Sequence, residues 1–74
     1  GDNTITPPSG GTPKGVLIQP PANNATSITL KGISGDTGIS LHLTNPTYIA
    51  LASPTATFVL TTGAAISDVL FVWN

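Results

Sequence analysis

The side chains of this 74-residue chain that could carry acid–base or nucleophilic chemistry are few and widely spaced. Proton-transfer catalysis needs a titratable group in a pocket, and usually a second group that orients it. The titratable groups are Asp2, Lys14, Lys31, Asp36, His42, Tyr48 and Asp68. No serine stands in a nucleophile elbow, and no sequence pattern places the single histidine as the general base for a serine. We therefore expect no enzymatic activity.

Two short segments look at first like ion or phosphate sites. Asp36 lies among glycines in "SGDTG", but no second carboxylate is near it in sequence, and calcium needs several oxygen ligands. The longer "GISGDTG" lacks the Lys-Ser/Thr pair and the helix of a phosphate loop. With no cysteine and one histidine, a usual zinc site is excluded. We expect no metal and no cofactor, and we interpret Asp36 as an Asx-turn residue and His42 as a solvated or interface residue.

Charge is unusually scarce, because only 7% of the residues are charged, against about 25% in an average soluble domain. The formal net charge of −1 gives no basic surface for phosphates, so we expect no nucleic-acid partner. No polybasic patch is present, and the apolar runs are far shorter than the roughly 20 residues of a spanning helix. We therefore expect no membrane partner.

The elements that must position these residues are strands, because apolar and polar residues alternate from Gly15 onward. Six such strands are predicted, near residues 16–19, 27–31, 39–44, 49–51, 57–61 and 69–74. Turn segments such as "QPPANNA", "SGDTG", "NPT" and "SPT" separate them. The pattern predicts an all-β domain over residues 15–74, a small antiparallel β-sandwich or barrel of about six strands.

Residues 1–14 differ from the rest of the chain, since they hold three prolines, three glycines and one large apolar side chain, Ile5. Such a segment buries too little to offset its ordering entropy. We predict an extended N-terminal arm or linker over residues 1–14 that orders against a partner.

Association is the expected activity, because a chain of this size buries only roughly 60% of its unfolded surface and has no disulfide to support a small core. The last strand, "VLFVW", is apolar on both faces. It is either a central strand covered on both sides or a strand whose second face meets another subunit. The predicted interface residues are Ile5, Pro7, Pro8, Leu70, Val72 and Trp73.

Aromatic residues and one Asn-X-Thr triplet could also serve binding or modification at the surface. The aromatic residues Tyr48, Phe58, Phe71 and Trp73 could stack on sugars or bases, but most have the parity of a core face, so core packing is favoured. Asn24-Ala25-Thr26 fits a glycosylation sequon, for which a polar turn is the favoured interpretation.

The segments "KGVLIQPPANNATSITLKG", "GISLHLTNPTYIAL" and "TTGAAISDVLFVWN" resemble the small all-β proteins and fibre-base domains on the virions of tailed phages and related viruses. The resemblance covers residues 14–74 and rests on strand and turn patterning, with no catalytic signature. It implies a virion surface protein, either a capsid decoration (cement) subunit or the capsid-bound part of a fibre or spike. No functional residue is carried over from it.

This resemblance implies that copies bind one another and the major capsid protein or another virion protein. The arm would anchor by extension or strand addition. A protein made in the host cytoplasm for the virion surface needs no secretory signal, and residues 1–14 show none. Two alternatives stay open: an extracellular filament subunit that polymerises by strand addition, and a small carbohydrate-binding module that uses Trp73 or Tyr48.

Overall fold

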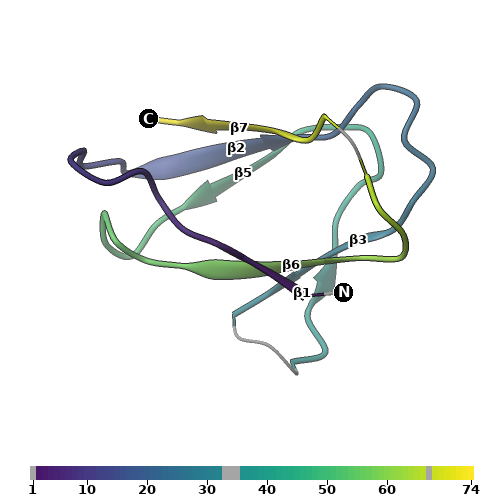
Figure 1. The fold of residues 1–74 in the computed structure, drawn as a ribbon, viewed down its shortest axis with the longest axis horizontal. Coiled ribbons are helices and arrows are strands. Elements are labelled where there is room, and N and C mark those ends of the chain that lie inside the picture. The colour runs from purple at the N-terminus through teal and green to yellow at the C-terminus, as the bar shows by residue number, and fades with distance from the viewer. Residues whose placement is uncertain (1, 33–35, 67) are drawn as a thin grey trace.

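The computed structural model describes residues 2–32, 36–66 and 68–74, which form seven strands and no helix. The strands are β1 (Asp2–Ile5), β2 (Gly15–Gln19), β3 (Ile28–Lys31), β4 (Ile39–Ser40), β5 (Thr47–Ala50), β6 (Phe58–Thr62) and β7 (Leu70–Trp73). They make two antiparallel sheets, one with the order β1-β6-β3-β4 and one with the order β5-β2-β7 (Figure 1). The predicted all-β sandwich is therefore confirmed.

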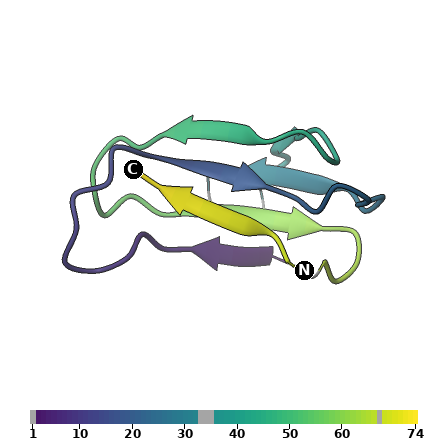
Figure 2. The same ribbon diagram turned by 90° about the horizontal axis from the view of Figure 1, so that it is seen from above.

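Almost every connection leads the chain from one sheet to the other (Figure 2). Only β3 and β4 are consecutive along the chain and also paired in one sheet. Prolines and glycines occupy the crossing segments, at Pro20, Pro21, Pro46, Pro54 and Gly63, where a ladder donor is missing or a turn is needed. Nearly all pairings thus join residues that are far apart in sequence.

The core lies between the two sheets and consists of alternate residues from the central strands, while Val59, on the other face of β6, is also buried. Val16 and Ile18 of β2 are 0% and 1% exposed, and they pack with buried Ile28 of β3 and with Phe58 and Leu60 of β6. Full burial of one such side chain stabilises a fold by about 1.5–3 kcal/mol. The period of two in the sequence of β2 therefore corresponds to a real inner and outer face.

The predicted N-terminal arm is not seen over residues 2–5, which form β1 and pair with β6 from Asp2↔Thr61 to Ile5↔Phe58. This pairing raises the number of strands to seven. Ile5 packs against the core, and Pro7 is buried. Backbone hydrogen bonds to β6 offset the ordering entropy of this segment, which its apolar burial alone would not.

The predicted strand over residues 39–44 is shortened to β4, which has two residues. Ile39 pairs with Leu30 at the edge of the sheet and stays 68% exposed, although its parity predicted a core position. Leu41 donates its N–H to the Ile28 carbonyl at 2.9 Å, and the chain then turns. The first two residues of the predicted "SGDTG" turn, 34 and 35, lie outside the described residues.

Candidate functional site

His42 is the single histidine of the chain. Its sequence position predicted that it lies on the polar face of a strand. In the structure it lies in the turn after β4. Its Nδ1 accepts the backbone N–H of Asn45 at 2.8 Å and that of Thr44 at 3.1 Å. The ring nitrogen that a general base would use thus serves the backbone of a turn.

The predicted sequon at Asn24 is also part of a local turn. The Asn24 Oδ1 accepts the Thr26 N–H at 3.1 Å, and its Nδ2 donates to the Thr26 carbonyl at 3.0 Å and the Leu43 carbonyl at 2.8 Å. The amide nitrogen that a glycan would occupy therefore joins the β2–β3 connection to the segment after β4. This geometry supports the polar-turn interpretation.

Replacing Asn24 with Ala is expected to lower the free energy of unfolding by about 1–2 kcal/mol, because one side chain supplies all three of these hydrogen bonds. Thermal or urea unfolding followed by circular dichroism measures the change. Asn23→Ala, at the exposed neighbouring position, is the matched control and is expected to stay within about 0.5 kcal/mol of the parent. Equal effects of the two substitutions would contradict the structural role of Asn24.

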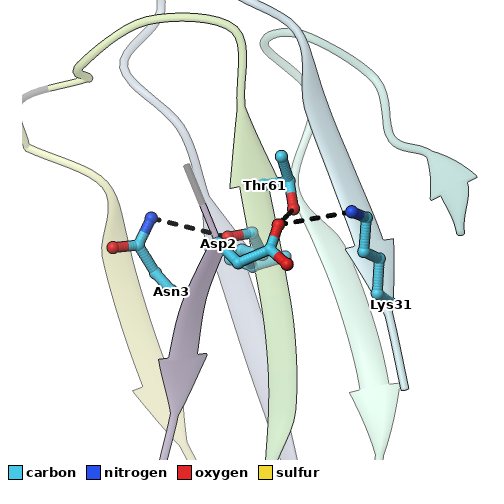
Figure 3. Close-up of polar contacts among 5 residues, drawn as sticks. Asp2, Asn3, Lys31 and Thr61 are labelled. Atoms are coloured by element: carbon cyan, nitrogen blue, oxygen red, sulfur yellow. Dashed lines mark hydrogen bonds and ion pairs between the residues drawn. The ribbon is translucent and has the colours of Figure 1, made fainter. Parts of the chain in front are cut away.

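The outer face of the β1-β6-β3-β4 sheet is polar (Figure 3). The Asp2 carboxylate on β1 accepts the Thr61 hydroxyl of β6 and lies 3.2 Å from the Lys31 Nζ on β3, so polar contacts cross three strands. The next residue, Asn3, has the parity of Ile5 and lies on the inner side of β1, where it donates to the Leu60 carbonyl at 3.5 Å. An exposed ion pair of this kind contributes about 0–1 kcal/mol. This face suits contact with water.

The outer face of the β5-β2-β7 sheet is apolar. Leu17 on β2 lies directly between Tyr48 on β5 and Val72 on β7, and Leu70 lies opposite Gln19. Tyr48, Leu70 and Val72 are 51%, 55% and 44% exposed, and Leu17 is half-buried. We call Leu17, Tyr48, Leu70 and Val72 the apolar patch. No Asp, Glu, Lys, Arg or His lies within the three strands that carry it.

Tyr48 fixes one end of the apolar patch. An added Cβ at Gly15 would overlap the Tyr48 ring and hydroxyl, so the tyrosine lies directly over this glycine of the central strand. The Tyr48 hydroxyl then donates to the Asn74 Oδ1 at 3.1 Å. One aromatic side chain thereby spans β5, β2 and the residue that follows β7, and this restricts the patch to one arrangement.

The six predicted interface residues do not share one surface. Leu70 and Val72 belong to the apolar patch, whereas Trp73 is on the inner face of β7, stacked with Phe71 at a centroid distance of 6.5 Å. Ile5 packs on the core, Pro7 is buried, and exposed Pro8 lines a cavity of about 290 Å³ with Trp73. Because β7 is an edge strand, the alternative of a central strand covered on both faces is wrong.

Leu17 and Tyr48 were not predicted as members of an apolar surface. Their signal was present in the alternation, since both have the parity opposite to that of the core residues Val16 and Ile49. The pairing that brings them beside Val72 had no signal in the sequence. Tyr48 and Trp73 lie on opposite faces of the sheet, so they do not form a shared stacking platform for a sugar.

No protein-family model, no curated protein and no solved structure matches this chain. Among the residues that the structure describes, no group of three or more His, Asp or Glu gathers around a common point. In the same part of the chain, no helix has the length and apolarity needed to cross a bilayer. The apolar patch is the candidate functional site because its large apolar side chains are exposed on strands that carry no charged residue.

Proposed function

We propose that this protein is a non-enzymatic structural subunit of a virion, a capsid decoration protein or a head-spike or fibre subunit. In this proposal it associates with copies of itself and docks on the capsid lattice, through the major capsid protein or another virion protein. Its place is the virion surface. The setting follows from the resemblance of residues 14–74 to small virion surface domains, and the mode of action follows from the apolar patch.

The observation that carries the proposal is the exposure of Tyr48, Leu70 and Val72 on a sheet without charged residues. Contiguous apolar surface of this kind is typical of protein–protein contacts, whose centres are poor in charge and rich in aromatic side chains. The opposite face of the sandwich carries the Asp2–Lys31 pair and exposed hydroxyls. The two faces are therefore suited to different surroundings, a partner on one side and water on the other.

The filament alternative needs β1 to leave its own sheet, because residues 2–5 already pair with β6 of the same chain. The carbohydrate alternative needs a stacking platform, and Tyr48 would have to supply it alone. Both alternatives therefore require more than the described arrangement offers, and the virion subunit remains the better-supported proposal.

The substitution Val72→Asp tests the proposal. A carboxylate at the β7 side of the apolar patch is expected to weaken self-association by about 2 kcal/mol, or roughly 30-fold in the dissociation constant, because it must be desolvated in the contact. Light scattering across a range of protein concentrations measures the change. Circular dichroism checks that the β signal is retained.

The matched control is Ser40→Asp, which adds the same charge at an exposed position on the other sheet. It is expected to leave association unchanged within twofold. Equal loss of association in both variants would mean that net charge alone acts, and it would contradict a role of the patch. A parent protein that stays monomeric at millimolar concentration would contradict self-association.

A further inference from the structure

Strand β7 has an open edge with a defined hydrogen-bonding pattern. The Asn74 N–H donates to the Gly15 carbonyl at 3.1 Å, and the register continues with Leu17↔Val72 and Gln19↔Leu70. Antiparallel pairs alternate between bonded and non-bonded, so Leu70, Val72 and Asn74 bond to β2. The backbone N–H and C=O of Phe71 and Trp73 therefore point away from β2. In the described part of the chain, β7 pairs with β2 alone.

The other three edge strands each carry a feature that blocks pairing with a second chain. The strand β1 has a charged residue, Asp2, β4 has only two residues, and β5 begins directly after Pro46. Charges, short length and proline are the usual protections of sheet edges. The strand β7, with the sequence "LFVW", has none of them, since the nearest charge is on Asp68, two residues before it.

The side of the sandwich next to this edge is open and apolar. Between β7 and β1 lies a cavity of about 380 Å³, lined mainly by Ile5, Leu60, Ile66, Val69 and Phe71. A strand added to β7 would lie across the mouth of this cavity. If that strand comes from the same protein, a two-fold axis brings an identical apolar opening to face the first one.

We infer that β7 pairs with β7 of a second copy in the antiparallel direction and joins two three-stranded sheets into one of six strands. This inference names the partner of the proposed association and so rests on the proposed function. The two-fold axis passes Phe71, which lies opposite Phe71 of the second copy as a hydrogen-bonded pair. Leu70 then lies opposite Val72 of the second copy as a non-bonded pair, twice in the dimer.

The chemistry of the strand selects this partner and this register. An uncharged strand meets its own copy without like-charge repulsion, and the open N–H and C=O groups of Phe71 are complementary to themselves. A shift that places Val72 opposite Val72 would leave Leu70 opposite the amide of Asn74. The inferred register instead pairs apolar with apolar and makes the two apolar patches continuous across the dimer.

Cysteine cross-linking tests the register, and the chain has no native cysteine to interfere. Leu70→Cys and Val72→Cys are made as separate proteins and oxidised alone and mixed. Non-bonded antiparallel pairs have the short side-chain separation that a disulfide needs. The mixture is expected to form disulfide heterodimer at least tenfold faster than either variant alone or mixed with a Ser40→Cys control. Rapid cross-linking of Val72→Cys alone would overturn the inferred register.

Amide hydrogen exchange by NMR tests the same inference without a substitution. On raising the concentration through the dimerisation range, the Phe71 and Trp73 N–H groups are expected to gain at least tenfold protection, while Val72, already bonded to β2, changes less than twofold. A dimer in light scattering without selective cross-linking or protection at Phe71 would overturn the edge pairing and leave the proposed function in place. A protein that never associates would overturn both.

Discussion

Replacing Ile18 with Ala is expected to lower the free energy of unfolding by about 3 kcal/mol, within the range observed for large-to-small changes in cores. Ile18 is 1% exposed and packs at the centre of the core between the two sheets. Removal of its side chain loses apolar burial and leaves a cavity that strands in two sheets cannot easily close. For a chain of this length, whose total stability is on the order of 4–11 kcal/mol, this loss is large. Urea unfolding measures it.

The neighbouring substitution Leu17→Ala is the matched control, because it removes a similar side chain from the other face of the same strand. Leu17 is half-buried in the apolar patch, so its loss is expected to cost less than about 1 kcal/mol of stability. It is expected to weaken self-association instead. Equal destabilisation by Ile18→Ala and Leu17→Ala would contradict the assignment of inner and outer faces.

Gly15→Ala is expected to destabilise the fold by about 2–3 kcal/mol, the scale of overpacking in a well-packed region. The added methyl group would overlap the Tyr48 ring and lie 2.7 Å from the Ile49 carbonyl oxygen, which belongs to the backbone of β5. Tyr48 could swing away only by losing its hydrogen bond to Asn74. The strand β5 could yield only by straining its pairing with β2. Thermal unfolding followed by circular dichroism gives the change.

Two further variants separate the effect of the overlap with Tyr48 from the other effects of an added methyl group. Gly11→Ala places the new methyl 3.8 Å from its nearest neighbour, an ordinary contact, and is expected to change stability by less than about 1 kcal/mol. Gly15→Ala combined with Tyr48→Ala removes the overlap with the ring and leaves the contact with the Ile49 carbonyl. If the double variant is as unstable as the two single losses added together, the tyrosine does not restrict this position.

The strands themselves were predictable, because successive side chains of a half-buried strand point alternately to the core and to the surface, so that apolar residues recur with a period of two. The core residues of β2, β3 and β6 follow this period, except that Val59 of β6 is also buried, and the structure has these strands within one or two residues of the predicted bounds. The prediction failed at Asp2–Ile5, where only Ile5 is large and apolar. That strand depends on backbone hydrogen bonds to β6 and on polar contacts of Asp2, and neither has a hydrophobic pattern.

The apolar patch was half predictable for the same reason. The run "VLFVW" predicted that both faces of the last strand are apolar, and it left open whether the second face, with Leu70 and Val72, is covered within the fold or meets another subunit. In the structure both residues are exposed. Leu17 and Tyr48 became part of the patch only because β2 lies between β5 and β7. Of the other predicted interface residues, Pro7 is buried and Trp73 is half-buried in the folded chain.

What the sequence determined by itself is local: strands, turns, a scarcity of charge, and which residues of a strand share a face. These follow from backbone geometry and side-chain polarity over a few residues. The tertiary structure decided which strands are neighbours, since all pairings except β3–β4 join strands that are not consecutive in the chain. It thereby placed β7 at an edge and gathered Leu17, Tyr48, Leu70 and Val72 on one face. Such pairings depend on how two apolar faces pack as wholes, which no short stretch of sequence specifies.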